Sequence, residues 1–493
     1  MQIKNKLANT DKTMVIVFLE LIRMSVGKDL AEYGVDLAHQ NGADYAEARL
    51  IDGQKTVFFL HNGTLISGEH KPWLGIGFRI LVNGGLAFVS VDKISKKEVK
   101  GAIISGVKMA KRSNPKEKID FGDPITNEAK WEVHTKEKLE DIDTDTMLEL
   151  LQEMDKMAEN HNINTRATTF EAQSSKKYII TSEGTKIEGN LSMLKYYSII
   201  TAKGLLDSEQ RWVDLTRSTG WEGVKTWLDE YDDHCARLAK VAAQSDSRIT
   251  GKVDFVVGPE VVGIICHENC GHPSEGDRIM GREGAQAGES FWRDLKLGES
   301  RVGSEHVTIC EDPTLIGTGG YYEYDDEGVK ARERILIKNG IINEPLLNRE
   351  FGVKFGLGSN GSARSENFDR EPIIRMSNTY MKPGDFTFEE LVEDVKHGIY
   401  MLSFTEWNID DRRYQSKYVG FECYQIVNGE ITEIMIRRPV MELTSVGLFS
   451  SIDGVSRDLT FDFPGICGKS DPMQGVPVYA GGGHVRMRGI RLG

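Results

Sequence analysis

The sequence has no hydrophobic run that is long enough to cross a membrane. Residues 14–22 are mostly apolar, but Glu20 interrupts them, and a spanning helix needs about 20 apolar residues. Lysines precede this stretch as in a signal peptide, yet no small-residue cleavage site follows it. We therefore expect no membrane association, and we interpret residues 1–25 as an N-terminal extension.

The sequence also lacks an excess of positive charge. It contains 61 Lys and Arg residues against 75 Asp and Glu residues, which gives a formal net charge of −14. A nucleic-acid-binding surface needs clustered Lys and Arg to contact phosphates, so the balance argues against nucleic acid as a partner. Internal repeats, heptad arrays and low-complexity tracts are absent as well, which excludes solenoids and long coiled coils.

Cysteine is scarce for a chain of this length. There are six cysteines in 493 residues, at positions 235, 266, 270, 310, 423 and 467, and their spacing does not suggest a disulfide framework. Scattered free thiols are typical of a reducing compartment. We therefore expect a cytoplasmic protein.

The elements that can be predicted indicate an α+β fold. We expect an α+β domain over residues 26–112, a central α+β domain over 113–245 that begins with a linker at 113–135, and a sheet-rich C-terminal domain over 246–493 that carries the metal-site helix described next. Asn-Gly pairs at residues 83–84 and 339–340 predict two hairpins. Ser95 and Glu98 form a capping-box pattern that predicts a helix to about Lys111.

Polar groups able to bind a metal are concentrated between Cys266 and Asp277. These twelve residues contain two imidazoles, three carboxylates and two thiols, and they follow the apolar run 261–265. Imidazoles are common zinc ligands, and a carboxylate beside them can take a proton from water activated by the metal. The pattern therefore favours His267 and His272 as zinc ligands with Glu268 as the base.

The spacing of the two histidines is unusual. The H-E-x-x-H pattern places its histidines four apart on one helical face, whereas His267 and His272 are five apart. On a regular α-helix that spacing turns the second side chain about 140° away from the first. A single π-type turn would restore a common face, and Gly271 and Pro273 favour such a turn. Otherwise the stretch is a polar helix end with two unrelated histidines.

Two other interpretations of this stretch remain open. Cys270 or Cys266 could act as a nucleophile with a histidine base, or the two thiols could bind the metal themselves. Because free cysteine is among the most buried residue types, core packing is the more ordinary role for both. A second acidic run, Asp325–Glu327, could bind a cation, although a solvated acidic turn is the simpler interpretation.

The motif H-E-x-x-G-H-x-x-E-G-D resembles the signature of the TldD/PmbA family, also called modulators of DNA gyrase. It comprises His267, Glu268, Gly271 and His272, followed by Glu275-Gly-Asp277. The resemblance implies a zinc metallopeptidase of TldD type that acts on unfolded or unstructured peptides, because PmbA (TldE)-type subunits lack the histidine–glutamate motif. It further implies homodimers, or heterodimers with a PmbA-type partner. A non-catalytic partner or regulatory subunit is the alternative function.

The resemblance extends to residues far from the motif. The family's C-G-K cysteine matches Cys467 and is implied as the third zinc ligand; without the resemblance, His306 and Glu275 would be its rivals. The segment G-x-x-R … R-M-x-N-T is similar to the family's groove segment, which makes Arg364, Arg375 and Asn378 candidates for substrate binding or for structural hydrogen bonding. Glu275 or Asp277 is a candidate for orienting a ligand histidine.

One segment departs from the family's pattern. Where the family usually has a glycine pair and a short polar turn, residues 403–413 carry bulky and charged side chains. We expect this segment to affect substrate preference and to leave the metal ligands untouched.

Overall fold

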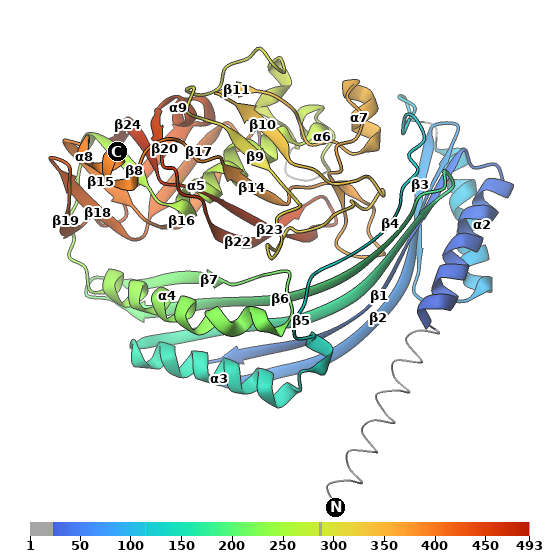
Figure 1. Ribbon diagram of the computed structural model, residues 1–493, viewed down its shortest axis with the longest axis horizontal. Coiled ribbons are helices and arrows are strands. Elements are labelled where there is room, and N and C mark those ends of the chain that lie inside the picture. Colours follow the sequence, from blue (N-terminus) through green and yellow to red (C-terminus); the bar gives the residue numbers. More distant parts are fainter. Residues whose placement is uncertain (1–22, 114, 285–287, 493) are drawn as a thin grey trace, which may run out of the picture.

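The computed structural model describes residues 23–113, 115–284 and 288–492, and it has two parts (Figure 1). A long curved sheet with helices on its outer face forms the N-terminal part, and several smaller sheets form the C-terminal part above its inner face. The predicted mixed α+β fold is confirmed. No helix in the described ranges has the length and apolarity that crossing a bilayer requires. Most of the predicted extension, residues 1–22, lies outside the described residues.

The N-terminal sheet has seven described strands and joins the first two predicted domains. In spatial order the strands are β3 (Gly85–Val91), β2 (Thr64–Val82), β1 (Tyr45–His61), β5 (Ile163–Thr181), β6 (Lys186–Lys203) and β4 (Glu128–Glu132), with β7 (Ser208–Asp214) also paired to β6. All pairings are antiparallel except that of β4 with β6.

The two faces of this sheet follow the two-residue period of its strands. On β1 the buried apolar residues Leu50, Phe58 and Leu60 point toward the helices. Glu47 and Arg49, at odd positions, point toward the C-terminal part, where Arg49 donates to the carbonyl of Asn367. Because successive side chains alternate between faces, one strand packs an apolar core on one side and places charges on the other.

Helices cover the outer face in two groups. A helix over residues 23–40 and α2 pack on one end of the sheet, and α3 and α4 pack on the other. The labelled helices and the short 3₁₀ turns of this part are α2 (Lys96–Arg112), η1 (Leu139–Asp141), α3 (Thr144–Asn160), η2 (Trp221–Thr226) and α4 (Trp227–Ala242).

The predicted helix cap and the two predicted hairpins are confirmed. Ser95 caps α2 by accepting from the Glu98 amide, and both predicted hairpins form. Asn83 and Gly84 have φ of 50° and 80°, as a type I′ turn requires. The predicted linker at 113–135 is wrong in part, because its residues 128–132 form β4 and bury Trp131 against the sheet.

The C-terminal part contains four described sheets. The first runs β11 (Ile341–Ile342), β10 (Arg334–Lys338), β9 (Ile309–Glu311), β14 (Asn378–Met381), β23 (Gln474–Gly482), β22 (Thr460–Lys469). The second runs β19 (Glu430–Met435), β18 (Cys423–Val427), β15 (His397–Met401), β8 (Gly251–Val257), β24 (Val485–Leu492), β21 (Ile452–Val455). The third runs β16 (Phe404–Ile409), β17 (Gln415–Gly420), β20 (Val440–Thr444), and the fourth pairs β12 (Ala363–Arg364) with β13 (Ile373–Ile374).

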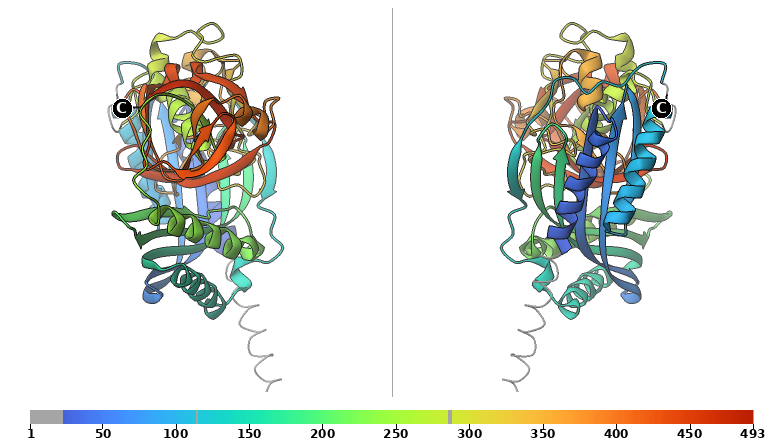
Figure 2. Two further views of the ribbon diagram at one scale, coloured as in Figure 1. Left: turned by 90° about the vertical axis from the view of Figure 1, so that its left-hand side faces the viewer. Right: turned by 90° about the vertical axis from the view of Figure 1, so that its right-hand side faces the viewer.

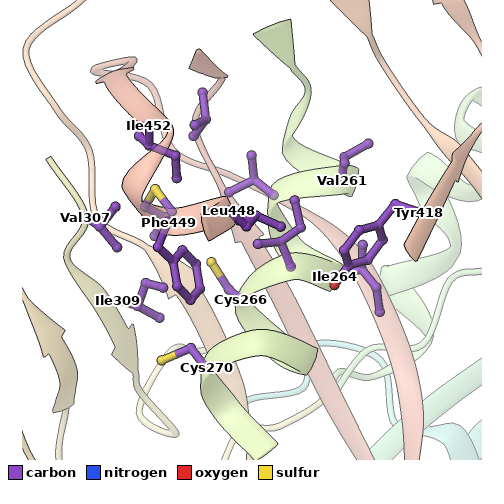
Figure 3. Close-up of a cluster of buried hydrophobic side chains, with 14 of the residues drawn as sticks. Val261, Ile264, Cys266, Cys270, Val307, Ile309, Tyr418, Leu448, Phe449 and Ile452 are labelled. Carbon is purple, nitrogen blue, oxygen red and sulfur yellow. The ribbon is translucent and has the colours of Figure 1, made fainter. Parts of the chain in front are cut away.

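These strands curve around one buried helix, α5 (Figure 2). Its apolar residues, together with Cys266 and Cys270, form the main C-terminal core with Leu448 and Phe449 (Figure 3). The described helices of this part are α5 (Pro259–Cys266), α6 (Gly276–Ile279), α7 (Arg349–Phe355), α8 (Phe388–Glu393) and α9 (Ser445–Ser450). Its shorter helical segments are η3 (His267–Gly271), η4 (His272–Ser274) and η5 (Phe291–Asp294).

The acidic run Asp325–Glu327 is not the solvated turn that the sequence suggested. All three carboxylates are buried. Asp325 accepts from the backbone amides of Val329 and Ala363, whereas its two neighbours face basic side chains of the N-terminal sheet. Glu327 accepts from Arg79 at 2.7 Å, and Asp326 accepts from Lys177. The run therefore joins the two parts of the molecule by buried ion pairs, which a pattern of neighbouring acidic residues does not reveal.

Breaking one of these pairs should destabilise the fold. In Glu327→Ala the buried Arg79 guanidinium loses one of its two carboxylate partners, and we expect the free energy of unfolding to fall by about 3 kcal/mol. Urea denaturation followed by circular dichroism measures the change. The control is Glu299→Ala, whose exposed pair with Lys296 should contribute less than about 0.5 kcal/mol. Equal midpoints for the two variants would contradict the role of the buried run.

Candidate metal centre

The site begins at the buried end of α5. Gly258 follows β8 as the N-cap of α5, and Pro259 occupies the first turn of the helix, where its missing N–H costs no hydrogen bond. All eight residues of α5 are buried, so the polar residues that follow it lie inside the protein. A polar segment at this depth needs partners for its side chains.

The predicted π turn is present at His267–Gly271. The amide of His272 donates to the carbonyl of His267, five residues earlier, and the two imidazoles lie edge to face with their centroids 4.9 Å apart. Gly271 is required at this point, since a Cβ there would lie 2.0 Å from the Met376 sulfur. The widened turn therefore places both histidines on one side.

Cys467 reaches the same point from β22. Its sulfur is 3.5 Å from Nε2 of His272, and one donor atom from each of His267, His272 and Cys467 lies within 4.8 Å of the others. In the described ranges, no other group of three His, Cys, Asp or Glu side chains brings its donor atoms this close together. Arg375 donates to the backbone carbonyl of Cys467 and to that of Gln474, which holds this end of β22.

The electrostatics favour the protonation states that bind a metal. Burial lowers the pKa of His267, so its imidazole is neutral at pH 7. Burial alone would raise the pKa of the Cys467 thiol, but His272 and then Arg375 lower it to about 7. Neutral imidazole and thiolate are the forms that ligate.

The donor set also fits zinc. Two imidazole nitrogens and one thiolate, with space left for a fourth ligand, are typical of catalytic zinc sites. Nδ1 of His267 is buried and has no hydrogen-bond partner among the described residues. The residues present therefore fit a zinc ion.

Glu275 supports His272 from behind. Nδ1 of His272 lies 3.0 Å from Oε2 of Glu275, which is fully buried and also accepts from Arg278. Burial opposes ionisation of Glu275, but the Lys469 ammonium and then His272 hold its pKa well below the usual range. An ionised carboxylate can only accept, so Nδ1 of His272 is the donor to Glu275, and Nε2 faces the Cys467 sulfur.

Asp277, the other candidate for this position, contacts Lys469 instead. Its carboxylate lies 2.7 Å from the Lys469 ammonium, which is 3.3 Å from Glu275. The sequence analysis missed Lys469, although it is the last residue of the C-G-K segment that contains Cys467. The two signature segments are therefore joined by the ion pairs of Lys469 as well as by the approach of Cys467 to His272.

The predicted base, Glu268, lies beside the two histidines with both of its oxygens engaged. Oε1 accepts from Nε1 of Trp407 and Oε2 accepts from Nη1 of Arg413, each at 3.2 Å. Burial alone would raise the pKa of Glu268, but His272, His267 and Arg413 together lower it. Both donors come from the segment that departs from the family pattern, which thus contacts the predicted base and not the metal ligands.

The rival residues are placed elsewhere. Cys266 and Cys270 are fully buried in the core, and burial raises the pKa of both thiols, so neither is a suitable nucleophile (Figure 3). His306 is exposed and packs against Phe386. Glu275 stands behind His272 and supports it.

The three candidates for substrate binding all form hydrogen bonds with backbone groups of the protein itself. Arg375 and Asn378 are fully buried; Arg375 binds two backbone carbonyls, and Asn378 bonds the backbone of Asp312 and Gly320. Arg364 is half-buried and donates to the carbonyls of Met376 and Pro477. The structure favours structural hydrogen bonding for these residues over direct contact with a substrate.

A cavity of about 990 Å³ opens in front of the cluster. Its walls include the three clustered residues and Glu268, together with β7, an edge strand of the N-terminal sheet, and β22, an edge strand of the C-terminal sheet. A peptide-sized ligand can therefore reach the cluster from between the two parts of the molecule.

Models of one protein family match most of the chain. The matches are to PmbA/TldA metallopeptidase domain 1 over residues 46–110, the central domain over 137–245, and the C-terminal domain over 250–493. A metalloprotease of Methanocaldococcus jannaschii is 32% identical over 457 residues, which cover 90% of this chain and 96% of the relative. The chain belongs to the TldD/PmbA family. This is a family of metallopeptidases.

Other members extend the comparison. A zinc metalloprotease TldD homolog of Saccharolobus solfataricus is 32% identical over 244 residues, 49% of this chain and 52% of that relative. The crystal structure of TldE from Thermococcus kodakarensis superposes with a TM-score of 0.74 at 16% identity and covers 94% of this chain and 99% of that one. That structural likeness confirms the family fold.

The cysteines offer a direct test of the electrostatics. Burial raises the pKa of the five other thiols, so iodoacetamide at pH 8 should alkylate metal-free protein first at Cys467, whose pKa is about 7 and which lines the cavity. Peptide mass spectrometry locates the modified residue. One equivalent of zinc should protect it, and earlier modification of Cys266 or Cys270 would contradict this assignment.

Proposed function

We propose that this chain is a zinc-dependent peptidase that cleaves unfolded or unstructured peptides. The observation that carries the proposal is the buried cluster of His267, His272 and Cys467 with a carboxylate, Glu268, beside it at the wall of a peptide-sized cavity. A zinc ion held by these three side chains would act as a Lewis acid on a peptide carbonyl and would lower the pKa of water.

Glu268 moves the proton in this proposal. A carboxylate oxygen of Glu268 takes a proton from the attacking water and then gives it to the nitrogen of the leaving amine. Trp407 and Arg413 use one acceptor position on each oxygen, and each oxygen has a second lone pair that remains available for the proton. The lowered pKa of Glu268 keeps it ionised, as a base must be at neutral pH.

The position of the cavity supports an extended peptide as the substrate. Among the described strands β22 pairs on one side only, and its residues 461–468 line the cavity around Cys467. A peptide that adds to such an edge is bound through its backbone, which allows broad sequence tolerance. A cavity of about 990 Å³ is too small for a folded domain, so the proposal is restricted to unfolded chains.

We also propose that the protein works in the cytoplasm as a dimer, either with itself or with a PmbA (TldE)-type subunit. A purely regulatory subunit is the competing function. It is disfavoured because a structural metal site does not need a general base, whereas Glu268 is buried beside the cluster and held by two donors.

Replacing the base should separate catalysis from metal binding. Glu268→Ala should retain about one zinc per chain, because Glu268 is not a ligand, while kcat for an unstructured peptide falls at least about 100-fold. Plasma mass spectrometry gives the metal content and a quenched fluorescent peptide gives the rate. Full peptidase activity in this variant would exclude Glu268 as the base. Wild-type peptidase activity that survives chelation would exclude a catalytic role for the metal.

Replacing the third ligand should instead weaken the metal site. We expect Cys467→Ser to bind zinc at least about tenfold more weakly, because a neutral hydroxyl replaces a thiolate. Competition with a coloured chelator measures the affinity. Cys423→Ala, a change at a buried thiol on β18, is the matched control and should leave zinc affinity unchanged. Equal affinities for the two variants would remove Cys467 from the ligand set.

A further inference from the structure

The segment that departs from the family pattern forms a hairpin over the predicted base. β16 and β17 pair in antiparallel register and are joined by a turn at residues 410–414, in which Arg413 has a φ of 59°. From this hairpin Trp407 holds one oxygen of Glu268 and Arg413 holds the other. A carboxylate bonded at both oxygens is fixed in position and in rotation about its last torsion.

The hairpin is itself attached to the residue that follows the base. Nδ2 of Asn269 donates to Ser416 at 3.0 Å and to Ser445 at 2.8 Å, and the hydroxyl of Tyr418 donates to its Oδ1. Asn269 is fully buried. Ser445 in turn donates to the backbone carbonyl of Arg413 at 2.8 Å.

These bonds form a closed loop. From Glu268 the loop passes through the backbone to Asn269, through Ser445 to the backbone of Arg413, and through the guanidinium back to Glu268. A ring of charge-assisted and neutral hydrogen bonds leaves little freedom to any one member. The backbone conformation at Arg413 therefore constrains the position of the Glu268 carboxylate.

Aromatic contacts fix the second donor. The ring of Trp407 packs against Trp212 of β7, Phe404 of β16 and Phe463 of β22, at centroid distances of 5.8, 5.6 and 6.5 Å. Edge-to-face packing on several sides determines the direction of the indole N–H. Trp407 thus ties the orientation of Glu268 to strands from both parts of the molecule.

We infer that the hairpin Phe404–Gly420 positions Glu268 for proton transfer, with Arg413 and Trp407 as its positioning residues. The inference rests on the proposed function, because it assigns these residues to the base of that reaction. Proton transfer depends on the base lying within hydrogen-bond reach of the reacting atoms, and a displacement of about 1 Å can lower the rate by about 100-fold. Neither residue needs to contact the substrate for this effect.

The kinetic test compares neighbouring arginines. Arg413→Gln should lower kcat by about 10- to 100-fold and leave KM within about threefold, because it disturbs the base and not the binding of the peptide. Arg413→Lys should recover part of kcat, since it keeps the charge. Trp407→Phe removes the N–H donor while keeping a ring, and should also lower kcat. The probe is a quenched unstructured peptide that the wild-type zinc enzyme cleaves.

Arg412→Gln is the matched control. Arg412 is in the same turn, but it is exposed and pairs with Asp294 and Glu289 away from the base, so kcat should stay within about twofold. Zinc content and thermal midpoint are measured for every variant to exclude loss of the fold. A raised KM with unchanged kcat in Arg413→Gln would overturn the inference and make Arg413 a substrate-binding residue.

A structural readout separates this inference from the proposed function. Crystal structures of the full chain with Trp407→Phe and Arg413→Gln combined should show the Glu268 side chain in a different rotamer from the wild type. An unchanged Glu268 would overturn the inference even if the enzyme is an active peptidase. A displaced Glu268 in the double variant, together with no peptide cleavage by the wild-type zinc protein, would leave the positioning role intact and reject the proposed function.

Discussion

The amide of His272 donates to the carbonyl of His267, and the geometry of the candidate metal centre depends on this one bond. A regular helix would direct two side chains five residues apart to different faces. Pro273 cannot donate to Asn269, and Gly271 lets the backbone lie against Met376, so the helix widens at this point. The π turn converts an unfavourable spacing into a pair of imidazoles on one side.

The buried location of this turn determines what surrounds it. Because α5 is enclosed by strands, the charges at its end are buried and need partners from distant parts of the chain. The carboxylates of Glu275 and Asp277 form ion pairs with Lys469, and the backbone carbonyl of Cys467 accepts a hydrogen bond from Arg375. The same requirement brings Trp407 and Arg413 to Glu268. The proposed ligands, the residues that support them and the proposed base are thus parts of one connected polar network.

The two parts of the molecule meet along both polar and aromatic contacts. Buried pairs such as Arg79–Glu327 fasten the inner face of the N-terminal sheet to the C-terminal part. At the cavity, Trp212 of β7 touches Trp407, which contacts the base. The N-terminal sheet therefore forms one wall of the cavity and also supports the C-terminal network.

Local chemistry could be read from the sequence because it depends on neighbouring residues. The Asn-Gly hairpins, the Ser95 cap, the π turn at His267–Gly271 and the mixed fold all follow from short-range rules of backbone and side chain. The closeness of Cys467 to His272, 195 residues apart, follows from no such rule, and it was anticipated only through the family resemblance. Tertiary structure alone decided that Asp325–Glu327 is buried, that Arg375 and Asn378 bond the backbone, and that the 404–420 hairpin reaches Glu268. The physical reason is the same in each case. A side chain's partners across the fold depend on how sheets pack, and that packing is a property of the whole chain.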